Sequence, residues 1–114
     1  MLTEVETEDG LVGYGEAMPD PPFTGETIES VLGALKNYLA PAVIGVNPSA
    51  FTELYRRMDY AIPFNPSAKA AIYIACHDLV GKGTRRPLYD LIGGRIRSDI
   101  EQVPEILFTT LKTF

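Results

Sequence analysis

Two short segments of alternating polar and apolar residues meet at Asp9-Gly10, and this pattern constrains the fold more than any other part of the sequence. Residues 2–8 alternate with a period of two, which is typical of a strand with one face in solvent. Because glycine accepts a positive φ, Asp9-Gly10 predicts a type I′ turn into a second strand over residues 11–17. A β-hairpin alone is only marginally stable in water, so this one needs a further strand or a layer of helices against it.

Prolines divide the rest of the chain. Three of them lie within residues 18–23, and this segment is therefore predicted to be a loop. A helix is expected over residues 27–39, where apolar residues recur at the spacing of one helix face. Thr24 or Thr27 is placed to cap its first free N–H groups, and Pro41 is expected to end it.

Two longer helices are expected to begin with an asparagine and a proline. Asn47-Pro48 and Asn65-Pro66 each combine a capping side chain with a proline in the first turn, where the missing N–H costs nothing. The second of these helices is expected to run to Lys82. Its small alanines would allow another element to approach closely.

The last part of the chain predicts a short helix and an extended tail. The helix, over residues 87–92, is expected to stop at Gly93-Gly94, a typical helix C-terminal signal. The tail over residues 95–110 predicts extended chain, with residues 106–108 apolar enough for a buried strand. Strands followed by helices indicate an α+β fold: a small antiparallel sheet, with or without a strand beyond the hairpin, then a bundle of three or four helices.

The composition narrows the classes of partner. With 15 acidic and 10 basic side chains, the formal net charge is −5, which disfavours general binding to nucleic acid or anionic lipid. No run of about 18 apolar residues is present, so we expect no membrane partner either. A single cysteine and the lack of a signal-like start predict a cytoplasmic protein. At 114 residues the chain is too short for a complete (β/α)8 barrel, which needs at least about 200 residues.

Several residues suggest chemistry, but each has a simpler structural interpretation. Adjacent helix positions diverge by about 100°, so Cys76 and His77 do not form a dyad; a structural histidine and a small core cysteine are predicted. Neighbours two apart on a strand stand parallel, so Glu4, Glu6 and Glu8 indicate a solvated face rather than a cation site. A basic cluster near the end of the long helix could hold an anion or a partner, but cations favoured there by the helix dipole are the simpler interpretation. Its members are Lys82, Arg85, Arg86, Arg95 and Arg97.

Taken in order, several motifs resemble one known family. They are Gly-Tyr-Gly-Glu-Ala at 13–17, Thr-Gly-Glu-Thr at 24–27, Asn-Pro-Ser-Ala-Lys-Ala-Ala at 65–71, Asp-Leu-Val-Gly-Lys at 78–82, Pro-Leu-Tyr at 87–89 and Leu-Ile-Gly-Gly at 91–94. Together they resemble the N-terminal capping domain of the enolase superfamily, in the branch of mandelate racemases and muconate-lactonizing enzymes. The second and third motifs are most similar to dipeptide epimerases. The resemblance covers roughly residues 3–100.

The resemblance implies an enzyme in two parts, a capping domain over the mouth of a catalytic barrel. Enzymes of this superfamily are known examples of a Lys or His base acting with one or two Mg²⁺ ions, which hold the enediolate formed by proton abstraction α to a carboxylate. Their bases and metal carboxylates lie on the barrel, so we expect no catalytic and no metal-binding residue in this chain. Mg²⁺ is expected in the full-length enzyme only, and the chain alone is expected to be inactive.

The resemblance also divides the chain. Residues 1–98 correspond to the capping domain without the family's first strand, and residues 99–114 to a linker with the possible first barrel strand. Phe23 and Thr24 lie where the family's second lid loop leans over the substrate, and they are the candidate substrate-binding residues. The alternative is a proline-stiffened connector.

The expected partner is a small carboxylate substrate held by the missing barrel, and a homo-oligomer is also expected. A dipeptide epimerase leads among racemases, epimerases and cycloisomerases. The alternatives are a fragment of a muconate cycloisomerase or of an N-acylamino acid racemase. A non-catalytic module that oligomerises through an unpaired sheet edge is the hypothesis from a different class.

Overall fold

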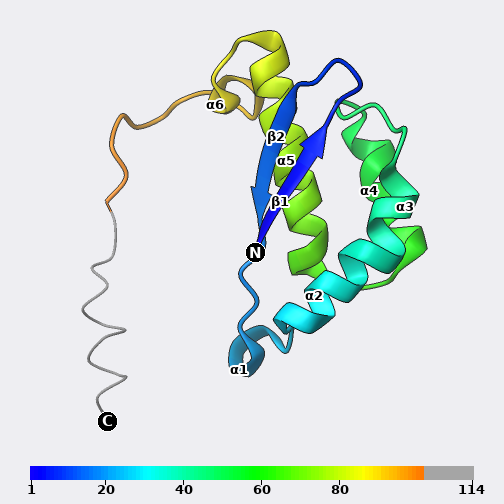
Figure 1. The fold of residues 1–114 in the computed structure, drawn as a ribbon. Helices are drawn as coiled ribbons and strands as arrows, with labels where there is room; N and C mark the ends of the chain where they lie inside the picture. Colours follow the sequence, from blue (N-terminus) through cyan, green and yellow to red (C-terminus); the bar gives the residue numbers. More distant parts are fainter. Residues whose placement is uncertain (102–114) are drawn as a thin grey trace.

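The predicted hairpin forms the amino end of the molecule (Figure 1). The structure is a computed structural model that describes residues 1–101. Strands β1 (Leu2–Glu6) and β2 (Val12–Glu16) pair antiparallel, with Leu2 opposite Glu16. The prediction of a type I′ turn is wrong, because such a turn has two central residues that both have a positive φ. Here three residues separate the paired Thr7 and Leu11, and only Gly10 among them has a positive φ, 86°.

Helix α5 (Pro66–Thr84) packs along the sheet and forms the centre of the fold (Figure 1). Gly13 and Gly15 of β2 lie directly against it. A Cβ atom on Gly13 would be 2.2 Å from the carbonyl oxygen of Ala75, so only glycine permits this approach. The predicted role of the helix's alanines is confirmed, since Ala71 and Ala75 are fully buried. The helix ends two residues later than expected.

The first helical segment begins as predicted but does not stop at Pro41. Helix α2 (Ile28–Ala34) starts after Thr27, whose side chain accepts a hydrogen bond from the Ser30 N–H at 3.0 Å. It continues into the π-helix η1 (Leu35–Leu39) and then α3 (Ala40–Val43).

The π-helix explains why Pro41 is tolerated. The N–H of Ala40 bonds to the carbonyl of Leu35, five residues back. Proline has no N–H to satisfy, and the wider turn relieves the clash between its ring and the preceding turn of an ordinary α-helix. The prediction that Pro41 ends the helix is therefore wrong.

The two Asn-Pro signals act differently from the prediction. The side chain of Asn47 accepts the Ser49 N–H at 3.0 Å and closes a turn, and helix α4 (Phe51–Ala61) begins only afterwards. Asn65 does immediately precede α5, but it has a left-handed backbone and makes no capping bond from its side chain. Pro66 is in the first turn of a helix as predicted, whereas Pro48 lies in the turn before α4, and neither asparagine caps a helix.

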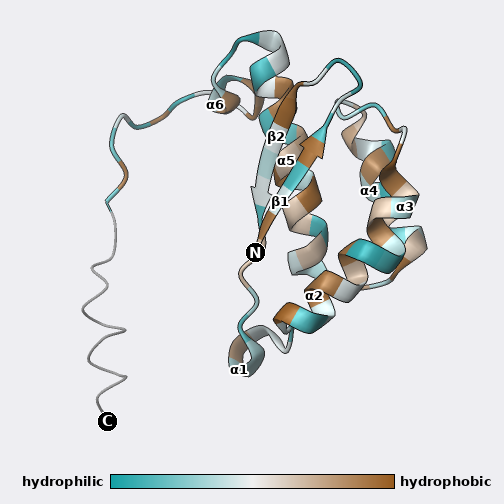
Figure 2. Ribbon diagram, viewed as in Figure 1, coloured by the Kyte–Doolittle hydropathy of each residue, from teal (hydrophilic) through white to brown (hydrophobic). Residues whose placement is uncertain are grey.

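The core lies between the sheet, α5 and the helices α2 to α4. Figure 2 shows apolar residues along α5 beside the sheet and hydrophilic residues in the hairpin loop. The largest fully buried side chains are Leu39, Leu54, Met58, Leu79 and Val31. An α+β fold with a small antiparallel sheet and several helices is thus confirmed.

Helix α6 (Leu88–Leu91) matches the expected short helix to within one residue at each end. Gly93 and Gly94 follow it with positive φ values of 126° and 97°. Residues 95–101 are exposed and contain no helix or strand. The strand expected at 106–108 lies outside the described residues.

Candidate functional site

The segment that holds the two candidate substrate-binding residues is a helical turn, not the predicted loop. Helix α1 (Pro21–Thr24) has prolines at its first two positions, where no N–H donor is required. The Thr24 N–H donates to the carbonyl of Asp20 at 2.7 Å, and Gly25 ends the turn with a φ of 75°. The prolines therefore start a turn of helix here rather than prevent one.

Phe23 and Thr24 have different surroundings within this turn. The Phe23 side chain is 88% exposed, so it is free to contact a partner or a ligand. The Thr24 hydroxyl is used internally, since it donates to the Asp20 carbonyl at 3.1 Å and accepts from the Glu26 N–H at 3.3 Å. Substrate contact by either residue stays a prediction.

Sequence reasoning missed Glu26 as a key residue of this site. Its carboxylate is buried and accepts hydrogen bonds from the backbone N–H and the hydroxyl of Ser67, at the start of α5. The two residues are 41 positions apart, so no local pattern pairs them. The only sequence signal for Glu26 was its position in the Thr-Gly-Glu-Thr motif, in which only the threonines were considered, as helix caps.

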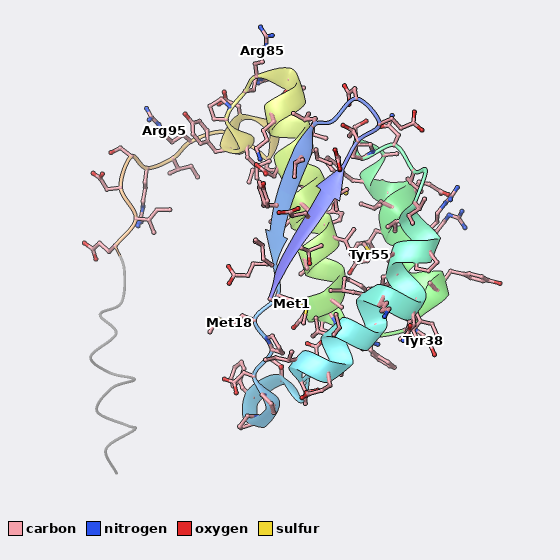
Figure 3. The ribbon with its side chains drawn as sticks, viewed as in Figure 1. Met1, Met18, Tyr38, Tyr55, Arg85 and Arg95 are labelled. Atoms are coloured by element: carbon pink, nitrogen blue, oxygen red, sulfur yellow. The ribbon has the colours of Figure 1, made fainter. Side chains whose placement is uncertain are left out.

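A shallow apolar hollow of about 510 Å³ lies between β2, α5 and the residues that lead to α1. Its lining residues are Leu2, Tyr14, Gly15, Glu16, Met18 and Ile74. Met18 is 83% exposed, and Figure 3 shows it beside Met1, at the end of the sheet nearest α1. Exposed apolar side chains thus run from this hollow towards the α1 turn, which suits contact with another protein surface.

A larger groove of about 1080 Å³ lies between β1 and the helices α2 to α4. Its floor and far wall are mainly apolar and include Leu32, Leu35, Val43, Ile44, Leu54 and Ile72. The hydroxyl of Thr3, on the β1 side, is buried without a hydrogen-bond partner among the described residues. The acidic residues Glu4, Glu6 and Glu8 border the groove on β1 and the hairpin loop.

The two edges of the sheet are protected differently. On β2, the Tyr14 N–H donates to the Asp78 carboxylate at 2.9 Å, and the Lys82 ammonium donates to the Val12 carbonyl at 2.9 Å. Side chains of α5 therefore occupy this edge.

Among residues 1–101, no strand pairs with the outer edge of β1. The bonded pairs Met1–Ala17 and Thr7–Leu11 fix the alternation of the ladder, so the backbone groups of Glu4 point away from β2. No backbone hydrogen bond reaches these outer groups within residues 1–101. An extended segment could pair with β1 and fill the neighbouring groove.

The possible nucleophile and base on α5 do not form a reactive pair. Burial raises the pKa of the Cys76 thiol to about 11, so the thiol is protonated at neutral pH. His77 stacks on Phe51 with ring centroids 3.8 Å apart, and its Nδ1 lies 2.9 Å from the Tyr73 carbonyl oxygen. The histidine therefore has a packing role.

The acidic residues that suggested a metal site and the basic cluster that suggested an anion site also have structural explanations. In the described part of the chain, no group of three or more His, Cys, Asp or Glu side chains lies together as metal ligands would. These residues therefore do not fit a Mg²⁺ site, and no chemical step is assigned to them.

In the basic cluster, Lys82 pairs with Asp78 at 2.6 Å, and hydrogen bonding to Lys82 is the main cause that lowers the pKa of Asp78. Figure 3 shows Arg85 pointing into solvent at the far end from Met18, and the guanidinium of Arg95 lies 5.9 Å from the centroid of the Tyr89 ring.

No helix among residues 1–101 has the length and apolar character that a membrane span requires.

Comparison with known proteins places these features in a family context. Residues 1–93 match the family described as "Mandelate racemase / muconate lactonizing enzyme, N-terminal domain". The N-succinyl-L-Arg/Lys racemase of Bacillus cereus is 44% identical over 99 residues, which are 87% of this chain and 27% of the racemase. The hydrophobic dipeptide epimerase of Enterococcus faecalis is 46% identical over 93 residues, which are 82% of this chain and 26% of the epimerase. The chain thus spans about a quarter of the length of these curated relatives.

Solved structures agree with the sequence matches. The crystal structure of the Bacillus cereus racemase superposes with a TM-score of 0.82 at 36% identity, over 98% of this chain and 33% of that one. The Enterococcus faecalis dipeptide epimerase, complexed with Mg and the dipeptide L-Leu-L-Tyr, superposes with a TM-score of 0.77 at 47% identity. That match covers 80% of this chain and 25% of the epimerase.

Proposed function

Since the chain belongs to the mandelate racemase/muconate lactonizing enzyme family of the enolase superfamily through its N-terminal domain, we propose that it is the capping part of a racemase or epimerase. The complete enzyme would abstract the proton α to the carboxylate of a small substrate, with Mg²⁺ stabilising the resulting charge. The observation that carries this proposal is the match of residues 1–93 to the family's N-terminal domain.

A dipeptide is the favoured substrate. The supporting relative is the hydrophobic dipeptide epimerase, which is 46% identical over 93 residues and has been solved with Mg and L-Leu-L-Tyr. An N-succinylated amino acid is the second choice, since the Bacillus cereus racemase is 44% identical. A muconate cycloisomerase comes third, on matches of up to 43% identity to chloromuconate cycloisomerases.

Within this function, the α1 turn acts as a lid over the substrate. Phe23 is exposed at its tip and would contact the distal part of a substrate, whereas Thr24 would shape the turn and present its backbone. Such a lid selects side chains and excludes water without transferring protons. Residues 1–98 would form the capping domain, residues 99–114 the connection into the barrel, and the protein would work in the cytoplasm.

By itself the chain would not catalyse the reaction. No metal-ligand cluster is present in residues 1–101, and the thiol and imidazole of Cys76 and His77 are held in packing roles. The direct test is exchange of the α-proton of L-Leu-L-Tyr in D₂O with Mg²⁺, followed by NMR. We expect no exchange above the blank, with the complete Enterococcus faecalis epimerase as the positive control. Exchange that increases with the concentration of this chain would overturn the proposal.

The capping role is tested with a chimera. Residues 1–93 of this chain replace the matching part of the Enterococcus faecalis epimerase, which keeps its own barrel. We expect the chimera to epimerise dipeptides with an altered KM pattern across side chains and a kcat within about tenfold of the parent. Phe23→Ala in the chimera should raise KM for bulky dipeptides more than it changes kcat. A folded chimera whose substrate preference equals that of the parent would count against a specificity role for these residues.

A second candidate function is self-association, and the open β1 edge favours it. A second copy would add a strand to this edge and cover the apolar groove beside it. The Glu4 N–H points outward, so Glu4→Pro removes a donor of the free edge without breaking a bond between β1 and β2. Light scattering should show dimers or larger species for the parent chain and for the control Glu4→Ala, but less association for Glu4→Pro. A parent chain that is monomeric at millimolar concentration would exclude this function.

A further inference from the structure

Glu26 is a buried carboxylate in an otherwise exposed stretch of chain. It is 8% exposed, while every residue from 20 to 25 is exposed. A carboxylate is rarely buried without hydrogen-bond partners, because desolvation of the charge is costly. Its partners therefore show what holds this stretch in place.

Both carboxylate oxygens of Glu26 face the first turn of α5. Oε1 accepts the backbone N–H of Ser67 at 3.1 Å, and Oε2 accepts the Ser67 hydroxyl. A negative charge at this position also interacts favourably with the dipole of the 19-residue helix. The contact therefore combines two hydrogen bonds with a favourable charge position.

Helix α5 depends on this contact because its own flanking residue does not cap it. Asn65 has a left-handed backbone with a φ of 55°, and its side-chain amide donates to the carbonyl of Pro63 at 2.9 Å. Pro66 has no N–H to be capped. The Ser67 N–H is consequently satisfied by a side chain from 41 residues earlier in the chain.

The α1 turn has few other attachments to the body of the molecule. No residue of α1 is buried, and the nearest buried position on its amino side is Ala17. On its carboxyl side, the Thr24 hydroxyl accepts the N–H of Glu26 itself. The turn is thus held together by its own hydrogen bonds and is attached to α5 through Glu26.

We infer that Glu26 is the positioning residue of the α1 turn: through Ser67 it fixes Phe23 relative to the start of α5. The consequence for substrate contact rests on the proposed function of α1 as a lid. The placement of Phe23 itself does not, and it is measured without any substrate.

A tryptophan in place of Phe23 provides the measurement. The chain contains no tryptophan, and Phe23 is almost fully exposed, so Phe23→Trp gives a single fluorescent reporter on the turn. Time-resolved anisotropy is recorded on the 114-residue chain with Phe23→Trp alone and combined with Glu26→Ala, Glu26→Gln or Ser67→Ala. Glu29→Gln is the matched control, since it removes an exposed carboxylate three positions away that is in the first turn of α2.

With Glu26→Ala we expect the fast local motion of the tryptophan reporter to grow in amplitude by about twofold or more, while far-UV circular dichroism keeps its native shape. Glu26→Gln, which retains one acceptor for the Ser67 N–H, should restore part of the parent value, and Glu29→Gln should match the parent. Amide exchange in residues 20–25 should become about fivefold faster with Glu26→Ala, the size of a lost helix cap.

Two other results would overturn the inference about Glu26. If Glu26→Ala lowers the melting temperature but leaves the motion of the tryptophan reporter and the exchange of residues 20–25 unchanged, Glu26 only caps α5 and the positioning role is wrong. If Glu26→Ala does not fold, Glu26→Gln and Ser67→Ala decide the question, because each keeps part of the contact. A reporter that stays fixed in both would also overturn the inference. Failure of the lid proposal would instead appear as an unchanged substrate preference in the chimera.

Discussion

The carbonyl oxygen of Ala71 occupies the space that a side chain on Gly15 would need: a Cβ atom there would lie 1.8 Å from it. Strand β2 therefore rests on the backbone of α5 with no side chain between them at this point. Real Cβ atoms do not approach an oxygen so closely, so the contact is possible only with glycine.

Gly15→Ala is expected to destabilise the fold strongly, because β2 would have to move away from α5. Overpacking in a core commonly costs about 1–3 kcal/mol, and the rigid backbone of α5 places this case at or above the upper end of that range. Urea unfolding followed by circular dichroism measures the loss.

Gly33→Ala is the matched control for this prediction. Gly33 is in α2 with nothing within 4 Å of the position of a Cβ atom. Alanine has the higher helix propensity, so this change should stabilise by about 0.5–1 kcal/mol. Equal effects of the two substitutions would mean that β2 does not pack on α5 as described.

A second prediction concerns the buried lysine of α5. The ammonium of Lys69, 6% exposed, lies 2.6 Å from the carboxylate of Asp59 on α4, which is 53% exposed. Asp59→Ala leaves a buried charge without its partner and should cost about 2 kcal/mol or more. Lys69→Met leaves an aspartate that water can solvate, so it should cost less.

Thermal unfolding of both variants checks this asymmetry. Glu53→Ala, on the same helix as Asp59, is the control, because Glu53 pairs with Arg56 and Arg57 in solvent and should matter little. A larger loss for Lys69→Met than for Asp59→Ala would contradict the argument.

Much of the fold followed from local patterns in the sequence. The hairpin is visible as alternation around a glycine, and the alanines at positions 71 and 75 indicated a close approach to α5 before any partner was known. These features are local, or depend on the size of one residue type. For the same reason the family resemblance could be recognised from short motifs.

The predictions that were wrong are those in which a contact between residues distant in sequence, or a π-helical turn, overrides a local sequence signal. Pro41 was expected to end a helix, but the π-helical bond from Ala40 to Leu35 accommodates it. The carboxylate of Glu26 takes the place of the expected Asn65 cap by accepting the N–H of Ser67, which is 41 residues further along the chain. The turn of helix at α1 was missed because the three prolines of residues 18–23 were taken to exclude a helix, although the first positions of a helix require no N–H donor.

The pH dependence of stability should report on the protected edge of β2. Hydrogen bonding to Lys82 and to the Tyr14 N–H lowers the pKa of Asp78 in the folded protein. A lowered folded pKa contributes stability above the unfolded value of about 3.9, and this contribution is lost as the pH falls through the folded pKa. Asp78→Asn should therefore lower the free energy of unfolding at pH 7 by about 1 kcal/mol, reduced by partial exposure.

The difference between Asp78→Asn and the parent should begin to shrink as the pH falls below about 4, where the aspartate becomes protonated in the unfolded chain, and should vanish only below the lowered pKa of the folded protein. Urea unfolding at pH 7, 5 and 3 measures it. Asp90→Asn on α6 is the control, since the side chain of Asp90 makes no hydrogen bond within residues 1–101. A difference that stays constant with pH would show that Asp78 acts by packing rather than by charge.

The last prediction uses the single cysteine as a reporter of the core. Cys76 is 2% exposed, and burial raises the pKa of its thiol to about 11. Since the thiolate is the reactive form, the native thiol should react with a disulfide reagent at pH 7 at least about a hundredfold more slowly than the unfolded chain. Reaction should require opening of the contact between the sheet and α5, so Gly15→Ala, which loosens this contact, should accelerate labelling while Gly33→Ala should not. Rapid labelling of the native parent chain would mean that the groove along β1 exposes Cys76, which also lines it.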